Sequence, residues 1–223
     1  MRAKLSVVIP TLNAASALPA CLSALMAGVE TGLIRELVIS DGGSQDATMA
    51  IAEEAGAVQV SGPPSRGGQL RRGAGAAGGD WLLFLHADSQ LPDGWSDAVE
   101  AQMAAGRPAC FRLKFDARGM APALVAGWAN LRSRLFGLPY GDQGLLISRA
   151  DYDAIGGFPD IPLMEDVAIV RKLKGRLVML PLAITTGADR YRRDGWMRRG
   201  LRNLILLLRY LAGAAPEQLA RRY

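Results

Sequence analysis

The sequence predicts an α/β fold in which a mostly parallel central sheet is flanked by helices. Apolar runs bounded by turn residues alternate with stretches of helical periodicity along most of the 223 residues. Such alternation indicates right-handed crossovers, which need a sheet covered on both faces. A hydrophobic content of 50% and a charged content of 21% are typical of a folded protein with a sizeable core.

The first half of the chain begins with a strand and a helix. Residues 4–10, KLSVVIP, form a β-branched run that ends at a proline. Leu18, Leu22 and Leu25 then recur at helical spacing, and Gly28 is a plausible helix end. Strands are predicted next at 36–40, 58–62 and 81–88, with helices at 47–57 and 91–106.

The second half repeats the alternation less regularly. A strand of mixed exposure is predicted at 109–117 and an apolar helix with late arginines at 120–137. A strand, a short helix and a glycine turn follow at 144–160, then a helix at 164–175 and a strand at 176–186. The economical division is one α/β domain over 1–188 and a basic helical tail over 189–223.

The tail combines positive charge with leucine. Seven arginines lie between Asp189 and Arg209, against only two aspartates, and the apolar run LILLL occupies 204–208. This run is far too short to span a bilayer. Two interpretations stay open: an amphipathic helix on an anionic membrane surface, or a helix that packs its leucines on the domain and leaves its arginines in water.

Bulk features exclude several classes of protein. Cys21 and Cys110 lack C-x-x-C spacing, so we expect reduced, buried thiols rather than a disulfide or zinc site. The single histidine argues against a histidine-rich metal centre, and the N-terminus has too short an apolar stretch for a signal peptide. We expect a cytoplasmic protein, either free or peripheral at the inner face of the membrane.

A glycine pattern suggests a dinucleotide site at first sight. Gly73, Gly75 and Gly78 fit G-x-G-x-x-G, which in a dinucleotide-binding fold joins a strand to the following helix. Here the polar run SRGGQLRRGA precedes the glycines and the apolar run WLLFLHAD follows them. Because this order is reversed, an NAD(P)-dependent oxidoreductase is only an alternative.

Polar side chains follow three of the predicted strands. Thr11 and Asn13 come after the first strand, Asp41 after the second, and His86 and Asp88 end the run at 81–88. Ligands of open parallel sheets bind beyond the carboxyl ends of the strands. Turn chemistry alone explains Asn13 or Asp41 singly, but it explains the repetition less well.

Four motifs in this order resemble one known family. VVIPTLN, VISDGGSQDAT, WLLFLHADS and GGFPDIPLMEDV, spread over about residues 4–175, are similar to the family 2 glycosyltransferases with the GT-A fold. The resemblance implies a nucleotide-diphosphate sugar donor whose nucleoside is held by Thr11, Asn13 and Asp41. An aspartate at position 41 suits uracil or guanine, so UDP- and GDP-linked sugars are both expected donors.

The resemblance also implies a divalent cation, Mn²⁺ or Mg²⁺. The family's Asp-x-Asp signature falls on residues 86–88, where only Asp88 is acidic. A carboxylate-held cation would stabilise the negative charge on the leaving diphosphate. His86 could ligate Mn²⁺, hydrogen-bond ribose or phosphate, or fill space. Arg66 is a candidate phosphate contact, whereas a solvated face is favoured for Arg71 and Arg72.

Two acids open the predicted helix at 164–175. In the resembling family this Glu-Asp motif supplies the base that takes the acceptor's proton, so Asp166 is the expected base with Glu165 beside it. The helix dipole alone also favours two acids at this position. Gly157 and Phe158 would then shape the acceptor side of the site.

Two further sets are implied more weakly. Asp142 and Gln143 correspond to a stretch near the donor sugar or acceptor, although a plain loop explains them almost as well. Arg192, Arg193 and Trp196 correspond to an element that closes over the diphosphate.

Together these features predict an inverting, metal-dependent glycosyltransferase acting on an unidentified hydroxyl acceptor. The basic tail motivates a lipid-linked acceptor. The other alternative is a non-catalytic nucleotide- or membrane-binding module on the same fold. Nucleic acid is not an expected partner, because the arginines cluster beside leucines rather than stacking aromatics.

Overall fold

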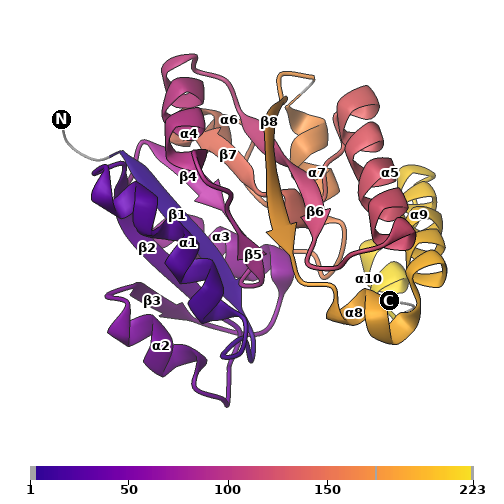
Figure 1. Ribbon diagram of the computed structural model, residues 1–223, viewed down its shortest axis with the longest axis horizontal. Coiled ribbons are helices and arrows are strands. Elements are labelled where there is room, and N and C mark those ends of the chain that lie inside the picture. Colours follow the sequence, from indigo (N-terminus) through magenta and orange to yellow (C-terminus); the bar gives the residue numbers. More distant parts are fainter. Residues whose placement is uncertain (1–3, 174, 222–223) are drawn as a thin grey trace.

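A computed structural model describes residues 4–173 and 175–221. Its described part contains an eight-stranded sheet in the order β3-β2-β1-β4-β7-β6-β8-β5, with helices on both faces (Figure 1). The strands are β1 (Leu5–Thr11), β2 (Ile34–Asp41), β3 (Val58–Ser61), β4 (Trp81–Phe84), β5 (Ser89–Gln90), β6 (Ala109–Phe115), β7 (Leu145–Ser148) and β8 (Val178–Thr186). The predicted fold class is confirmed.

The described part of the chain contains ten helices, and those for which the sequence predicted a range fall close to it. They are α1 (Leu18–Glu30), α2 (Thr48–Glu54), α3 (Arg66–Ala76), α4 (Trp95–Ala104), α5 (Met120–Phe136), α6 (Arg149–Ala154), α7 (Glu165–Lys172), α8 (Asp189–Asp194), α9 (Trp196–Leu211) and α10 (Pro216–Ala220). A 3₁₀ turn, η1 (Gly141–Gln143), precedes β7. This turn, the short β5 and the break between α8 and α9 were not predicted.

The strands near the middle of the sheet bury side chains on both faces. Leu5, Val7 and Ile9 of β1 join a core cluster with residues of α1 and α4. Val8 of the same strand joins a second cluster with residues of α3, α6 and α7. Strands covered on both faces carry continuous rather than alternating apolar runs, which is why the sequence reads VVI here.

The pairing of β7 brings an unforeseen loop to the carboxyl edge of the sheet. β7 is antiparallel to both β4 and β6, whereas β1, β2, β3 and β4 pair in parallel with one another and β6 pairs in parallel with β8. Phe84, the last residue of β4, is therefore paired with Leu145, the first residue of β7. As a result η1 lies where β4 ends.

The C-terminal segment packs on the domain at one end of the sheet. Leu206, Leu207 and Leu219 form a cluster with Leu163 and Met164. Figure 1 shows α8, α9 and α10 beside α5 at this end of the molecule. One face of the tail is thus packed on the domain, which agrees with the interpretation that the tail helix packs its leucines there. The division of the chain at residue 188 stays a prediction.

Candidate active site

A cleft of about 820 Å³ opens where the parallel strands end. This volume lies within the range of about 300–1,000 Å³ typical of ligand sites. Its walls include residues 10–14 at the end of β1, the start of α3, residues 86–88 after β4, residues 140–142, residues 163–166, residues 186–187 and 189–191, and the inner side of α9. The ends of β1 and β4 therefore meet at this cleft as the sequence predicted, whereas Asp41 at the end of β2 is not among the residues that line it.

Asp41 holds the loop after β2 together. Its carboxylate accepts hydrogen bonds from Thr11 Oγ1 at 2.8 Å, from Ser44 Oγ at 2.6 Å, and from the backbone N–H groups of Gly43 and Ser44, each at 2.7 Å. Burial alone would raise the pKa of Asp41, but these donors lower it. A carboxylate offers about four lone-pair sites, so Asp41 is saturated within the protein. Its contact with a nucleoside stays a prediction.

Asn13 fastens the loop after β1 to the same turn. Its side-chain oxygen accepts the backbone N–H of Gln45 at 2.9 Å, and its own N–H donates to Ser44 Oγ at 2.8 Å. Its φ of 51° lies in the left-handed region, which asparagine tolerates better than most residues. Thr11 and Asn13 both line the cleft.

Arg66 joins the start of α3 to two other walls. Its Nε lies 3.2 Å from Glu165 Oε1, and its Nη2 lies 3.2 Å from His86 Nε2. The helix approaches closely because Gly67 has no side chain: a Cβ there would lie 2.0 Å from the carbonyl oxygen of Pro159. Arg66, placed among the phosphate contacts by the sequence, lines the cleft as expected.

His86 is a neutral hydrogen-bond acceptor in this network. Burial, followed by the charges of Arg66 and Arg190, lowers the pKa of His86 from 6.5 to about 3. A guanidinium has only donors, so Nε2 accepts from Arg66 and the ring proton is on Nδ1. The Nε2 lone pair is therefore engaged by a cation.

The two acids at the start of α7 differ sharply in environment. Glu165 is 1% exposed, and burial, then the neighbouring Asp166, raises its pKa from 4.5 to about 7 against the effect of Arg66. Its Oε2 is buried and has no hydrogen-bond partner among the described residues. Asp166 is partly exposed to the cleft, and its Oδ2 accepts the backbone N–H of Gly141 at 2.8 Å. Of the pair, Asp166 is the more exposed in the cleft.

Met164 turns the chain into this helix. It adopts a φ of 68°, which is unusual for a residue with a side chain, and it is buried. Left-handed backbone at a non-glycine residue costs about 1–3 kcal/mol and occurs often at functional sites. The strain is located directly before the two acids.

Asp142 is a third carboxylate on the cleft wall. Burial, opposed by Arg132 and reinforced by Asp166, raises its pKa from 3.8 to about 6. Its Oδ1 is buried, and the part of the chain that the structure describes offers it no hydrogen-bond partner. Gln143 beside it is turned into the core instead. Its amide accepts from Ser133 Oγ at 2.6 Å and donates to the carbonyl oxygen of Phe111 at 3.0 Å.

Asp88 and Arg190 are two exposed side chains of opposite charge that line the cleft. Asp88 is exposed and follows β4, and a Cβ on Gly187 would lie 3.1 Å from its Oδ2. Arg190 lies on the same cleft, where its charge helps to lower the pKa of His86. Burial raises the pKa of Asp88, and the charge of Arg190 only partly opposes this rise. Within the described ranges neither side chain forms an ion pair. This leaves one carboxylate and one guanidinium directed at solvent.

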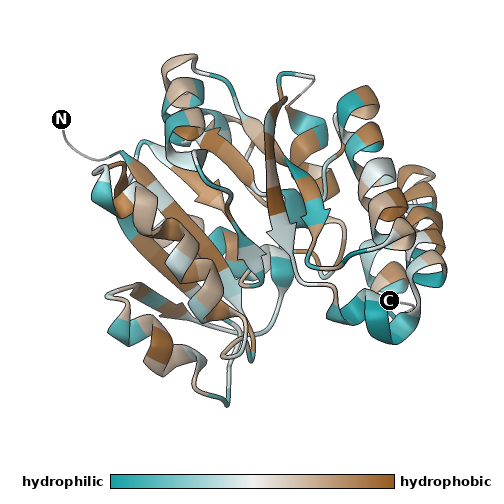
Figure 2. Cartoon of the chain, viewed as in Figure 1, coloured by the Kyte–Doolittle hydropathy of each residue, from teal (hydrophilic) through white to brown (hydrophobic). Residues whose placement is uncertain are grey.

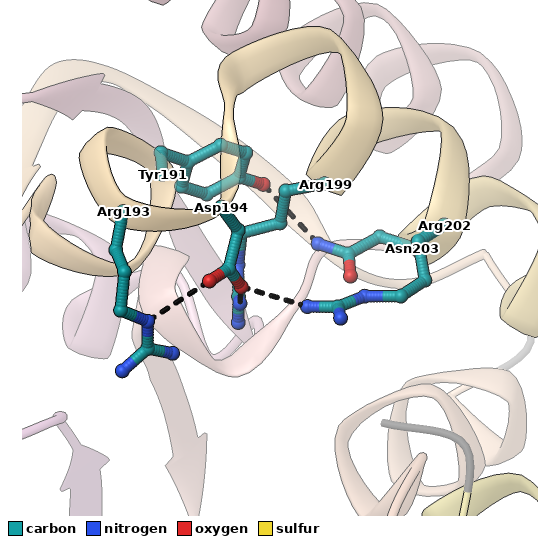
Figure 3. Close-up of polar contacts among 6 residues, drawn as sticks. All are labelled: Tyr191, Arg193, Asp194, Arg199, Arg202 and Asn203. Atoms are coloured by element: carbon teal, nitrogen blue, oxygen red, sulfur yellow. Dashed lines mark hydrogen bonds and ion pairs between the residues drawn. The ribbon is translucent and has the colours of Figure 1, made fainter.

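The junction of α8 and α9 is fastened by one aspartate. Asp194 binds Arg193 at 2.9 Å, Arg199 at 2.6 Å and Arg202 at 3.0 Å (Figure 3). Asn203 Nδ2 also donates to Tyr191 Oη at 3.2 Å. The result is a rigid corner whose Tyr191, Arg199 and Asn203 line the cleft.

The tail residues selected from sequence are used for packing. Arg192 binds Asp189 and the carbonyl oxygen of Asp116. Trp196 packs edge-on against Phe115 at 5.0 Å and stacks on Tyr191 at 5.0 Å. Arg192, Arg193 and Trp196 themselves do not line the cleft. Arg190, two positions before Arg192, lines the cleft instead, as does Arg199.

Gly157 and Phe158 are also outside the cleft lining. Phe158 is 3% exposed and packs on Phe84 at 4.9 Å. Gly157 has a φ of 62°, and a Cβ there would lie 2.7 Å from the Tyr152 ring. The turn therefore serves the core beneath α7 rather than the surface of the cleft.

The model of glycosyl transferase family 2 matches residues 6–133, more than half of the chain. The chain belongs to glycosyl transferase family 2. The family predicted from the four motifs is thereby confirmed. The match includes Thr11, Asp41, Arg66 and Asp88 but ends before Asp166.

Curated relatives of this family 2 chain match it over a short stretch. A PGL/p-HBAD biosynthesis glycosyltransferase of Mycobacterium bovis is 40% identical over 93 residues, which are 39% of this chain and 36% of that protein. A TPR repeat-containing protein of Synechococcus elongatus is 35% identical over 91 residues, or 40% of this chain and 21% of that protein. The chain thus spans about a third of the length of the first relative.

Solved structures confirm the GT-A fold of the family 2 chain. Glucosyl-3-phosphoglycerate synthase from Mycobacterium tuberculosis, in complex with Mn²⁺, UDP and phosphoglyceric acid, superposes with a TM-score of 0.59 at 22% identity, covering 83% of this chain and 69% of the synthase. S. aureus TarS 1–349 superposes with a TM-score of 0.63 at 19% identity, covering 92% and 64%.

The glycine pattern of this family 2 chain packs a helix rather than forming a phosphate loop. Gly73 and Gly75 lie inside α3, with β4 after them. A Cβ at Gly73 would lie 2.4 Å from Val8 Cγ1. The glycine therefore allows α3 to approach β1, which removes the structural basis of the oxidoreductase alternative.

Proposed function

We propose that the family 2 chain transfers a sugar, with inversion, from a nucleoside diphosphate donor to a hydroxyl acceptor. One observation carries this proposal: a single cleft holds Asp88 after β4, Arg66 at the start of α3, Arg190 on α8 and Asp166 at the start of α7. The first set suits a diphosphate, because guanidinium groups bind phosphate oxygens well. The carboxylate of Asp166 suits an acceptor hydroxyl.

A divalent cation, Mn²⁺ or Mg²⁺, fits this cleft only with the help of the substrate. Within residues 4–173 and 175–221, no three His, Cys, Asp or Glu side chains gather as a metal site. Asp88 offers one exposed carboxylate, whereas the Nε2 of His86 already accepts from Arg66. Mg²⁺ is commonly held by one or two carboxylates, waters and substrate phosphates. The bound cation would neutralise negative charge on the leaving diphosphate.

Uridine is the nucleoside that the comparisons favour. The synthase complexes contain UDP with Mn²⁺ or Mg²⁺, and one contains UDP-glucose. In this chain the loops around Thr11 and Asn13 would receive the nucleoside, with Asp41 keeping them in place through its four hydrogen bonds. Arg190 takes the diphosphate role that the sequence assigned to Arg192 and Arg193.

Asp166 is proposed as the general base. Inversion requires a base on the opposite side of the anomeric carbon from the leaving group. The backbone N–H of Gly141 orients the Asp166 carboxylate from one side. Glu165 acts as a positioning residue, since its buried carboxylate holds Arg66 rather than facing the acceptor. Asp142 would accept a hydrogen bond from a sugar hydroxyl.

Calorimetric titration tests the donor site. UDP, GDP, CDP and NADH are each titrated with and without Mn²⁺ into the wild type, Asp88→Ala and Asp93→Ala, a matched exposed aspartate outside the cleft. We expect UDP to bind in a Mn²⁺-dependent manner that only Asp88→Ala abolishes. The absence of binding by any diphosphate would overturn the proposal, and NADH binding would revive the oxidoreductase.

A second measurement separates catalysis from binding. Release of UDP from UDP-glucose is followed for the wild type and Asp166→Asn. Loss of a general base lowers rates by about 10²–10⁴-fold, while UDP affinity should stay unchanged. Binding without turnover in the wild type would favour the non-catalytic module.

The location of the chain is part of the proposal. Cys21 and Cys110 are both free and buried, which agrees with the reducing conditions of the cytoplasm. Among the described helices, none is long and apolar enough to cross a membrane.

A further inference from the structure

Two neighbouring helices carry most of the large hydrophobic side chains that the described chain exposes. Of its fifteen large hydrophobic side chains that are exposed, eleven lie on α5 and α9. We call this surface the α5–α9 face. It consists of Met120, Leu124, Trp128, Leu131, Leu135 and Phe136 with Met197, Leu201, Ile205, Leu208 and Leu211. Contiguous exposed apolar patches mark interaction sites.

The exposed residues form one stripe on each helix. On α5 the first five follow one another at steps of four, four, three and four residues, and on α9 the first four follow at steps of four, four and three. Such spacing places side chains on a single side of a helix. The opposite sides already serve the core, through Ala126 and Ala129 of α5 and Leu206 and Leu207 of α9. Folding of the described chain therefore leaves both stripes uncovered.

The two stripes adjoin. A Cβ on Gly200 of α9 would lie 3.7 Å from Val125 Cγ2 of α5, so the helices touch along their flanks. Figure 1 shows them side by side at the end of the molecule, and Figure 2 shows hydrophobic residues on both. The stripes thus combine into one face.

The charged residues on these two helices are all arginines. Neither α5 nor α9 contains an aspartate or glutamate. Arg198, Arg202 and Arg209 follow one another at steps of four and seven, so they run along one side of the α9 stripe, and Arg134 lies on α5. Arg134, Arg198 and Arg209 are exposed. If the same two helices of a second copy met this face, arginines would oppose arginines, whereas anionic headgroups complement them.

We propose that the α5–α9 face docks on an anionic membrane surface. The apolar stripes would enter the boundary between headgroups and acyl chains, and the arginines would contact anionic headgroups, as interfacial amphipathic helices do. Trp128, 47% exposed, suits this boundary because its ring is amphipathic.

Docking places the cleft beside the lipid. The inner side of α9 contributes Arg199, Asn203 and Leu206 to the cleft wall, while its outer side carries the stripe. The same helix therefore separates membrane from substrate site. This consequence, a lipid-linked acceptor, rests on the proposed function, but docking itself does not.

Vesicle flotation tests the docking. The full chain is mixed with vesicles of phosphatidylcholine alone or with phosphatidylglycerol, at low and high salt. We expect binding to the anionic vesicles only, weakened by salt. The double variant Leu201→Glu, Leu208→Glu should lose it, and Arg198→Glu with Arg209→Glu should weaken it by about tenfold or more. Met26→Glu, a 50% exposed residue on α1, is the matched control.

Three outcomes would overturn the docking proposal. They are no flotation of the wild type, equal binding to both vesicles, or unchanged binding by the double leucine variant. A wild-type dimer in light scattering that the leucine variant dissociates, without lipid binding, would make the face a self-association surface. UDP affinity of the wild type and of each variant is measured in parallel. If the wild type did not bind UDP, the proposed function would be refuted but the docking proposal would not.

Discussion

Two glycines in the same helix should respond oppositely to alanine. Gly73 and Gly75 both lie inside α3. At Gly73 a Cβ would lie 2.4 Å from Val8 Cγ1 and 3.3 Å from Ser40 Cβ. At Gly75 no described atom lies within 4 Å of the added Cβ. The pair therefore isolates packing from helix propensity.

The expected magnitudes follow from these distances. Alanine in a helix interior is favoured over glycine by about 0.5–1 kcal/mol, so Gly75→Ala should stabilise the fold by that amount. Gly73→Ala gains the same term but overpacks a core side chain, which costs about 1–3 kcal/mol. Val8 is 0% exposed in β1 and has little room to move. We expect the free energies of unfolding of the two variants to differ by about 1–3 kcal/mol.

Thermal unfolding followed by circular dichroism provides the assay. For a domain of this size, about 1 kcal/mol shifts the melting temperature by roughly 2–4 °C. Gly75→Ala should melt above the wild type and Gly73→Ala below it. The reasoning is refuted if Gly73→Ala melts at or above the temperature of Gly75→Ala, because the glycine would then not be required by close packing.

Three further predictions concern the cleft and its walls. The pKa of Glu165 is raised from 4.5 to about 7 in the folded state, so folding takes up a proton between these two pH values. The free energy of unfolding therefore falls as pH rises through that window. Urea unfolding from pH 4 to 8 should show a weaker dependence of this free energy on pH for Glu165→Gln than for the wild type. Arg190→Ala should weaken UDP binding by about tenfold and reduce its salt dependence, whereas Arg192→Ala should do neither. Calorimetry at two salt concentrations measures both quantities. If the two variants lowered UDP affinity equally, Arg190 would not be the diphosphate contact. Asp194→Asn should lower the melting temperature by loosening the corner between α8 and α9, and a melting temperature equal to the wild type would show that its ion pairs contribute nothing.

Local patterns in the sequence were enough for most elements and for part of the cleft. Runs such as VVI and WLLF identify buried strands because a strand covered on both faces has no polar side. Polar residues directly after such strands must lie at the carboxyl edge of the sheet, which is why Thr11, His86 and Asp88 were found. These inferences need only the chain direction and a spacing of a few residues.

Long-range packing determined the rest of the cleft. Arg190 and Arg192 are two residues apart on one short helix, and only the way α8 packs on Asp116 decides which of them faces the cleft. Gln143 and Asp142 are adjacent, but Ser133 and Phe111 from distant elements bind the glutamine in the core. No local pattern contains those partners.

The sequence by itself determined the α/β alternation, the family and the strand-end residues, since each depends on short-range order along the chain. Only the tertiary structure decided that β7 runs antiparallel and brings η1 to the site, that Asp41 is saturated and Glu165 buried, and that one apolar side of α9 is docked while the other is exposed. Those features depend on which surfaces meet. Residues far apart in the chain decide that, because burial and charge act through space rather than along the sequence.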